Sequence, residues 1–158
     1  MEPARSRDGG AADPRTVATP TEPPVVLFVC RHGAAKSVLA AAALERIAGA
    51  MGIPIAGQAA GVEPDEDISA AVVALLPERA ADLRRRRPRR VTSADVESAS
   101  LTVTFNLDPS ELPRAPVRAL AWDDIPAVSD DPDAAREAIE RHLVDLLGSE
   151  SAPGRRPG

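Results

Sequence analysis

The sequence predicts an α/β fold, a single three-layer domain in which helices flank a four-stranded, mostly parallel sheet. Two observations predict it. Short runs of apolar and β-branched residues alternate along the chain with longer segments whose apolar residues recur at helical spacing. The first run, residues 25–29, is apolar throughout, as expected of a strand that is covered on both faces. With 158 residues, the chain is long enough for one domain and too short for two of ordinary size.

Residues 25–147 are predicted to form this domain, between two disordered tails. Residues 1–24 mix prolines, glycines and charges, so they cannot bury enough apolar surface to offset the entropy cost of becoming ordered. Residues 148–158 have the same character. We therefore expect all fixed structure to lie between the two tails.

The first half of the domain reads as strand, loop, helix and strand. The strand at residues 25–29 is followed by a helix that begins at Ser37, because apolar residues then recur at i, i+4, i+7 and i+11. Gly52 and Pro54 supply its stop signal. Residues 55–60 are a second strand, residues 61–64 a loop, and residues 69–81 a second helix.

The second half adds two strands and a helix. Residues 101–105 are rich in β-branched side chains and are bounded by Asn106, which is typical of a strand. Residues 117–121 are the fourth strand. The last helix starts near Asp133 and stops at Gly148. Its apolar face consists of Ala135, Ile139, Leu143 and Leu146.

Composition excludes several classes of function. The chain has no tyrosine, one tryptophan and two phenylalanines, so aromatic stacking on nucleic acid is not expected, and the net charge of -5 points the same way. Cys30 is the only cysteine, which excludes a disulfide within the chain and fits a reducing, cytoplasmic setting. No apolar stretch approaches the roughly 20 residues of a membrane helix, and residues 1–24 lack the apolar core of a signal peptide.

The loop that joins the first strand to the first helix carries the predicted chemistry. In an open parallel sheet, ligands bind beyond the carboxyl ends of the strands, where Cys30 lies. The free N–H groups at the start of a helix favour bound oxyanions and the thiolate form of a nearby cysteine. Gly33 permits a turn that points successive N–H groups inward. Lys36 adds a positive charge, and Ser37 can both hydrogen-bond the sulfur and cap the helix.

We therefore predict that Cys30 is a thiolate nucleophile whose loop binds a tetrahedral oxyanion without a metal or a cofactor. The predicted oxyanion-binding residues are Arg31, His32, Gly33, Ala34, Ala35, Lys36 and Ser37. Two of these have alternative roles. The guanidinium of Arg31 either reaches the oxyanion or points outward, and His32 either contacts the oxyanion and thiolate or shapes the loop through a backbone hydrogen bond.

The run Val26-Leu27-Phe28-Val29-Cys30, followed by Lys36-Ser37, resembles the phosphate-binding loop of low-molecular-weight protein tyrosine phosphatases and of the arsenate reductases built on the same fold. Residues 59–64, 91–96 and 99–105 are similar to later segments of that family, and Trp122-Asp123-Asp124 is similar to the acidic loop of its reductase branch. The resemblance implies that the ligand is phosphate, arsenate or a phosphorylated substrate.

Three departures from the family pattern bear on activity. Lys36 stands where the family has arginine; lysine keeps the charge but loses the planar fork that binds two oxygens at once. Asp133 replaces an aromatic residue of the tyrosine phosphatases, which lowers the expectation of a phosphotyrosine substrate. The two further cysteines of thioredoxin-coupled reductases are absent, and Asn106 stands near the expected place of one. Arsenate reduction would therefore need a small external thiol as the reductant.

The resemblance also implies a general acid in the loop before the last helix. Asp124, shortly after Trp122, and Asp131, in the pair Asp131-Pro132, are the candidates, and Asp123 is a further neighbour. Each can instead be a solvated loop charge or a helix-start residue. His142, on the last helix, is interpreted as a surface or boundary residue.

Residues 84–90 contain six arginines and one proline. This run is interpreted either as a solvated loop or as a docking site for an acidic partner or a phosphorylated ligand. For the whole chain the leading hypothesis is a cysteine-dependent phosphatase or arsenate reductase. The alternatives are a catalytically impaired oxyanion-binding module of the same fold, and a phosphocysteine carrier like the B components of sugar phosphotransferase systems.

Overall fold

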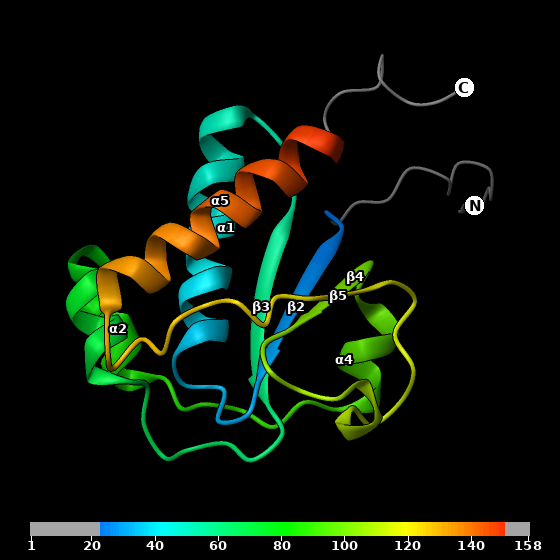
Figure 1. Cartoon of the computed structure of the whole chain (residues 1–158), viewed down its shortest axis with the longest axis horizontal. Coiled ribbons are helices and arrows are strands. Elements are labelled where there is room, and N and C mark those ends of the chain that lie inside the picture. The colour runs from blue at the N-terminus through cyan, green and yellow to red at the C-terminus, as the bar shows by residue number, and fades with distance from the viewer. Residues whose placement is uncertain (1–22, 151–158) are drawn as a thin grey trace, which may run out of the picture.

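The computed structural model describes residues 23–150, which form a parallel four-stranded sheet between two layers of helices (Figure 1). The sheet order is β3-β2-β4-β5, and every pairing is parallel. The strands are β2 (Val25–Cys30), β3 (Ala56–Gly61), β4 (Leu101–Thr104) and β5 (Ala119–Ala121). The helices are α1 (Lys36–Met51), α2 (Ala70–Leu75), α3 (Ala80–Arg85), α4 (Ser93–Ser98) and α5 (Pro132–Glu150), with short 3-10 turns at Pro77–Arg79 and Pro109–Glu111. The predicted fold class is confirmed.

The central strand β2 supplies both layers of the core because its side chains alternate between the two faces of the sheet. Val26, Phe28 and Cys30 belong to the larger apolar cluster, which α1 and α5 cover. Leu27 and Val29 belong to the smaller cluster on the other face, beside α4. Residues 26–30 are all buried, so the continuous apolar run is explained by burial on both faces.

The few aromatic residues of the chain lie together in the larger apolar cluster. The rings of Phe28, Phe105 and Trp122 contact one another at centroid distances of 5.9 to 6.2 Å. Leucine, isoleucine and alanine side chains from α1 and α5 complete this layer. Phe28 lies two residues before Cys30 in β2, and Phe105 lies directly before Asn106 at the end of β4. The aromatic cluster therefore supports the part of the sheet from which Cys30 and Asn106 extend.

Helix α1 begins at Lys36, one residue before the predicted start, and Ala35 is its N-cap residue. Ser37 lies in the first turn, is fully buried and forms no capping hydrogen bond, so its predicted capping role is wrong. The predicted stop is confirmed: Gly52 has a left-handed conformation, with φ of 71°, and its N–H meets the carbonyls of Ala48 and Gly49.

Two predicted helix boundaries are wrong for reasons specific to proline and glycine. The helix expected at residues 69–81 is divided into α2, a 3-10 turn and α3, because Pro77 has no N–H with which to continue α2. The last helix passes through Gly148 and ends at Glu150, since a glycine near a helix end costs only about 1 kcal/mol relative to alanine. Residues 148–150 therefore belong to a helix, whereas the rest of both predicted tails, apart from residues 23–24, lies outside the described residues.

The end of the arginine run at residues 84–90 is anchored at the edge of the sheet. The backbone of Arg89 and Val91 pairs with Gly61, the last residue of β3. The guanidinium of Arg89 binds the Asp95 carboxylate at 2.8 and 3.1 Å, while Arg90 donates to the carbonyl of Val62 at 2.7 Å. Partial burial raises the pKa of Asp95, but hydrogen bonds from Arg89 and Thr92 outweigh it and hold that pKa below its usual value. All six arginines are exposed, in agreement with the solvated interpretation, but this part of the run is anchored at the sheet edge.

Candidate active site

Cys30 lies at the base of a cavity of about 380 Å³ at the carboxyl end of the sheet. Its side chain is buried, and its sulfur lies 3.1 Å from the hydroxyl oxygen of Ser37, which is fully buried. The Cys30 thiol donates to this hydroxyl, so the predicted hydrogen bond between the two residues is present. When Cys30 is ionised, the Ser37 hydroxyl is placed to donate to the thiolate.

Four segments surround this cavity. The loop after β2 contributes Arg31, His32, Ala34, Ala35 and Lys36. The β3–α2 connection contributes Asp65 and Ser69, and the end of β4 contributes Phe105 and Asn106. Residues 127–129, before α5, form the remaining wall. The structure thus brings most of the predicted oxyanion-binding loop to one cavity, although Gly33 and Ser37 do not line it.

The loop owes its shape to close contact between two backbones. Gly33 has φ of 63°, and a Cβ atom at that position would lie 2.7 Å from the backbone nitrogen of Gly61. Only glycine combines this left-handed conformation with so short an approach. The first turn of the loop therefore lies directly on the end of strand β3.

Hydrogen bonds from the β3–α2 connection turn the loop carbonyls outward. Backbone N–H groups of Glu63, Asp65 and Ser69 donate to the carbonyls of residues 31, 32 and 34 at 2.7, 3.1 and 2.9 Å. In a trans peptide the carbonyl and the following N–H point in opposite directions. The N–H groups of residues 32, 33 and 35 are consequently directed to the inner side of the loop, as an anion-binding nest requires.

Lys36 is held at the cavity wall by a chain of polar contacts. Its ammonium nitrogen donates to the side-chain oxygen of Asn106 at 3.0 Å. Asn106 is itself fixed by Asp123, whose carboxylate accepts from the Asn106 backbone at 2.8 Å and whose carbonyl accepts from its amide nitrogen at 3.2 Å. An ammonium has three N–H groups, so Lys36 retains two for a ligand in the cavity.

Of the two predicted roles of Arg31, the structure favours the outward-pointing guanidinium. Its guanidinium binds both carboxylate oxygens of Glu111, at 2.9 and 3.1 Å, and lies 3.8 Å from Glu63. His32 contacts the β3–α2 connection: its Nδ1 atom lies 3.2 Å from the carbonyl of Glu63 and 3.3 Å from the carboxylate of Asp65. Both side chains therefore brace the loop, and both residues also line the cavity.

The two aspartates predicted as general acids are engaged elsewhere. The Asp124 carboxylate lies 2.9 Å from Nε2 of His142, and this hydrogen bond lowers the pKa of Asp124, which disfavours its protonated form. Asp131 accepts from the N–H of Ala134 at 3.1 Å and so caps α5. Neither residue is among those that line the Cys30 cavity.

Sequence reasoning missed one residue and the contacts of another. Asp65 is the acidic side chain that lines the cavity, yet it sits in an acidic stretch, residues 63–67, that reads as a solvated loop. His142 is partly exposed, as predicted for a boundary residue; its ring stacks on Trp122 at 4.7 Å and pairs with Asp124. No sequence signal places Asp65 in the cavity; only the folded arrangement does.

Two negative findings apply to residues 23–150. No cluster of three or more histidine, cysteine, aspartate or glutamate side chains suited to a metal ion is found there. None of the helices in this part of the chain is both long and apolar enough to cross a membrane.

A sequence model of the family described as low molecular weight phosphotyrosine protein phosphatase matches residues 25–116, more than half of the chain. The chain belongs to this family. Members of the family bind phosphate or arsenate oxyanions. The family includes cysteine-dependent phosphatases and arsenate reductases, so the coarse class of chemistry follows from membership.

Individual relatives come from both branches of the family. A protein of Halobacterium salinarum described as a "Putative arsenate reductase" is 28% identical over 130 residues, which cover 76% of this chain and 88% of that protein. The crystal structure of an arsenate reductase from Archaeoglobus fulgidus is 31% identical with a TM-score of 0.51, and the match covers 78% of this chain and 98% of that one. A low molecular weight protein tyrosine phosphatase from T. tengcongensis is 20% identical with a TM-score of 0.64, covering 80% and 99%.

The contact of Gly33 with Gly61 yields a prediction for stability. Gly33→Ala should lower the free energy of unfolding by more than about 2 kcal/mol, because it adds left-handed strain to a backbone clash. Gly49→Ala is the matched control: Gly49 lies in α1 with open space around it, so alanine should raise stability by up to about 1 kcal/mol. Urea denaturation measures both, and a Gly33→Ala protein as stable as the wild type would contradict the packing argument.

Proposed function

We propose that this protein is an enzyme that uses Cys30 to attack a tetrahedral oxyanion, either a phosphate monoester or arsenate. One observation supports the proposal above the rest: the Cys30 sulfur lies at the base of the cavity, 3.1 Å from a buried Ser37 hydroxyl in the first turn of α1. A buried cysteine that served only as a small apolar residue would need no buried hydroxyl as the hydrogen-bond partner of its sulfur.

With a phosphate monoester, the thiolate attacks phosphorus, so that a sulfur–phosphorus bond forms while the bond to the leaving oxygen breaks. The loop N–H groups and Lys36 hold the non-bridging oxygens as their charge develops. Once Cys30 is ionised, the Ser37 hydroxyl, 3.1 Å from the sulfur, donates to it and stabilises it first as nucleophile and later as leaving group. Water then attacks the phosphocysteine, which releases phosphate and restores the thiolate.

With arsenate, the thiolate displaces one oxygen as water and forms a sulfur–arsenic bond. One external thiol then attacks the Cys30 sulfur; arsenic leaves as arsenite with the electron pair, and a mixed disulfide remains on Cys30. A second external thiol reduces that disulfide and frees Cys30. Because Cys30 is the only cysteine, both electrons come from the small thiol, and we propose that the protein works in a reducing compartment such as the cytoplasm.

Activity assays test the proposal. Purified protein should hydrolyse p-nitrophenyl phosphate, or reduce arsenate in the presence of a small thiol. Cys30→Ser should bring either rate to background while leaving phosphate binding and the unfolding midpoint near wild type, since the oxygen is nearly isosteric. If neither substrate turns over in a Cys30-dependent manner, the enzyme proposal is wrong.

The second candidate is an oxyanion-binding module with impaired catalysis, and Lys36 favours it. The ammonium binds Asn106 as a point charge and lacks the fork that would follow two equatorial oxygens into the transition state. Lys36→Arg in the same assays separates the candidates. A wild type that binds phosphate without turnover, combined with a Lys36→Arg variant that gains turnover, would favour the binding module.

We further propose Asp65 as the group that protonates the leaving oxygen. In an in-line attack the leaving oxygen lies opposite the sulfur, so its proton donor must face the cavity. Asp65 lines that cavity, and His32 lies 3.3 Å from its carboxylate. Asp124 and Asp131, the candidates from sequence, bind His142 and the start of α5 instead.

Leaving-group dependence distinguishes a proton donor from a residue that only shapes the loop. Asp65→Asn should lower turnover of phenyl phosphate roughly a hundredfold or more, and should affect p-nitrophenyl phosphate much less because that leaving group needs little protonation. Asp124→Asn and Asp131→Asn are matched controls, and an asparagine side chain in the second of them can still cap α5. Equal losses of Asp65→Asn on both substrates, or a phenyl-phosphate-specific loss in either control, would overturn the assignment.

A further inference from the structure

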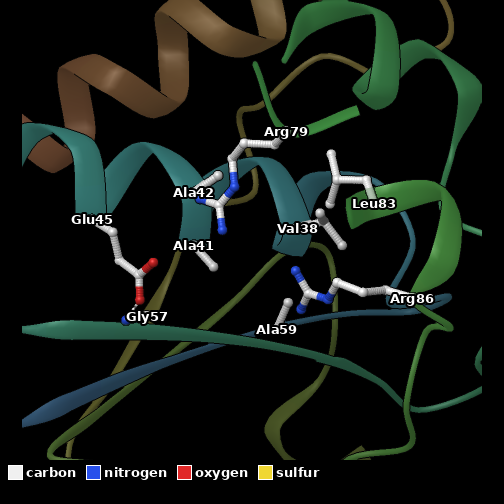
Figure 2. Close-up of a pocket in the computed structure, with 9 residues that line it drawn as sticks. All are labelled: Val38, Ala41, Ala42, Glu45, Gly57, Ala59, Arg79, Leu83 and Arg86. Carbon is white, nitrogen blue, oxygen red and sulfur yellow. Dashed lines mark hydrogen bonds between the residues drawn. The ribbon is translucent and has the colours of Figure 1, made fainter. Parts of the chain in front are cut away.

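A second cavity of about 230 Å³ lies between α1, the edge strand β3 and the segment that contains α3 (Figure 2). It shares no lining residue with the Cys30 cavity. Its charged residues are Arg79, Arg86 and Glu45, and its base is formed by small side chains of α1 and β3. Nothing in the proposed reaction uses this cavity.

Small residues create the space. Gly57 of β3 lies so close to α1 that a Cβ atom there would approach the carbonyl oxygen of Ala41 to 2.9 Å. Ala41, Ala42 and Ala59 line the cavity with methyl groups only. The helix can therefore lie against the edge strand while leaving room above these methyl groups, where longer side chains from other segments reach in.

The carboxylate of Glu45 is already in use. It accepts a hydrogen bond of 3.2 Å from the backbone N–H of Gly57, at the edge of the sheet. This bond satisfies a donor that has no neighbouring strand. Glu45 therefore stabilises the strand edge and offers limited neutralisation to the two arginines that share its cavity.

Both guanidinium groups point into the space between α1 and β3 (Figure 2). Arg79 is half-buried, and within residues 23–150 its side chain has no hydrogen-bond or ion-pair partner. Arg86 lies 4.0 Å from Asp82 in an exposed pair, and such pairs contribute little. Two arginines against one engaged carboxylate leave the cavity with an excess of positive charge.

Arg86 also belongs to the arginine run at residues 84–90. Arg87, Arg89 and Arg90 donate to the carbonyl of Glu66, to Asp95 and to the carbonyl of Val62, so they hold the run in place. That anchoring directs Arg86 toward the cavity. Some arginines of the run therefore stabilise the fold, whereas Arg86 lines a cavity together with a second arginine, Arg79.

We propose that this cavity binds a small oxyanion of the phosphate class between Arg79 and Arg86. Guanidinium groups present N–H pairs that match the oxygens of phosphate, and an anion between them would offset their mutual repulsion. The volume is below the roughly 300 Å³ at which pockets for drug-sized ligands begin, which favours free phosphate over a nucleotide. The proposal does not depend on catalysis at Cys30.

Nuclear magnetic resonance titration with inorganic phosphate, at constant ionic strength with chloride, tests the site on the full chain. The backbone amide of Gly57 reports on the second cavity and that of Gly33 on the Cys30 loop, so the two sites are followed separately. The Gly57 resonance should shift with saturation. Arg79→Gln and Arg86→Gln should each raise the phosphate Kd measured at Gly57 about tenfold, because each removes one charge-assisted contact.

Arg85→Gln is the matched control, since Arg85 is the last residue of α3, directly before Arg86, and lines neither cavity. It should leave the Gly57 titration unchanged. A Gly57 shift that is absent, that grows linearly without saturation, or that weakens equally in Arg85→Gln would overturn the proposal. If the Gly57 shift saturates and the Gly33 shift does not, the result would support phosphate binding in the second cavity and contradict phosphate binding at the Cys30 loop only.

Discussion

The contact between the backbones of Gly33 and Gly61 is the constraint on which the site depends. Cys30 and Gly61 are partners in the register of β2 and β3, so the chain that leaves Cys30 must turn directly over the end of β3. Glycine at both positions lets the loop lie close enough for the residues after β3 to bind its carbonyls. That bracing directs the N–H groups inward, above the buried sulfur, and a side chain at either glycine would lift the loop off its support.

The electrostatics of the loop follow from what holds Lys36. Asp123 fixes Asn106, and Asn106 fixes the ammonium at the cavity wall, so the positive charge is positioned even though the guanidinium fork of the family is absent. A positioned point charge stabilises a bound oxyanion in the ground state and in the transition state alike. Uniform stabilisation of this kind increases affinity more than turnover. In the proposed function, the departure at Lys36 therefore affects rate, whereas anion binding depends mainly on the backbone N–H groups.

The sequence predicted those features that local pattern determines. The apolar run of β2, the helical spacing of α1 and the glycine after it identified the strand, the loop and the helix that surround Cys30. The position of Asp65 in the cavity and the contacts of the arginine run could not be predicted, because they depend on which loops meet at the sheet edge. Asp131 is a different case: an aspartate before Pro132 is a local signal of a helix start, which the family resemblance led us to weigh as catalytic.

The central claim is that Cys30 attacks the oxyanion rather than merely lying beneath it. Rapid acid quenching during turnover of p-nitrophenyl phosphate, followed by mass spectrometry of the peptide that contains Cys30, tests it directly. The account predicts a phosphoryl group on Cys30 that accumulates within the first turnover and is absent from Cys30→Ser. Turnover that proceeds at an unchanged rate in Cys30→Ser, with no adduct on the wild-type cysteine, would contradict it.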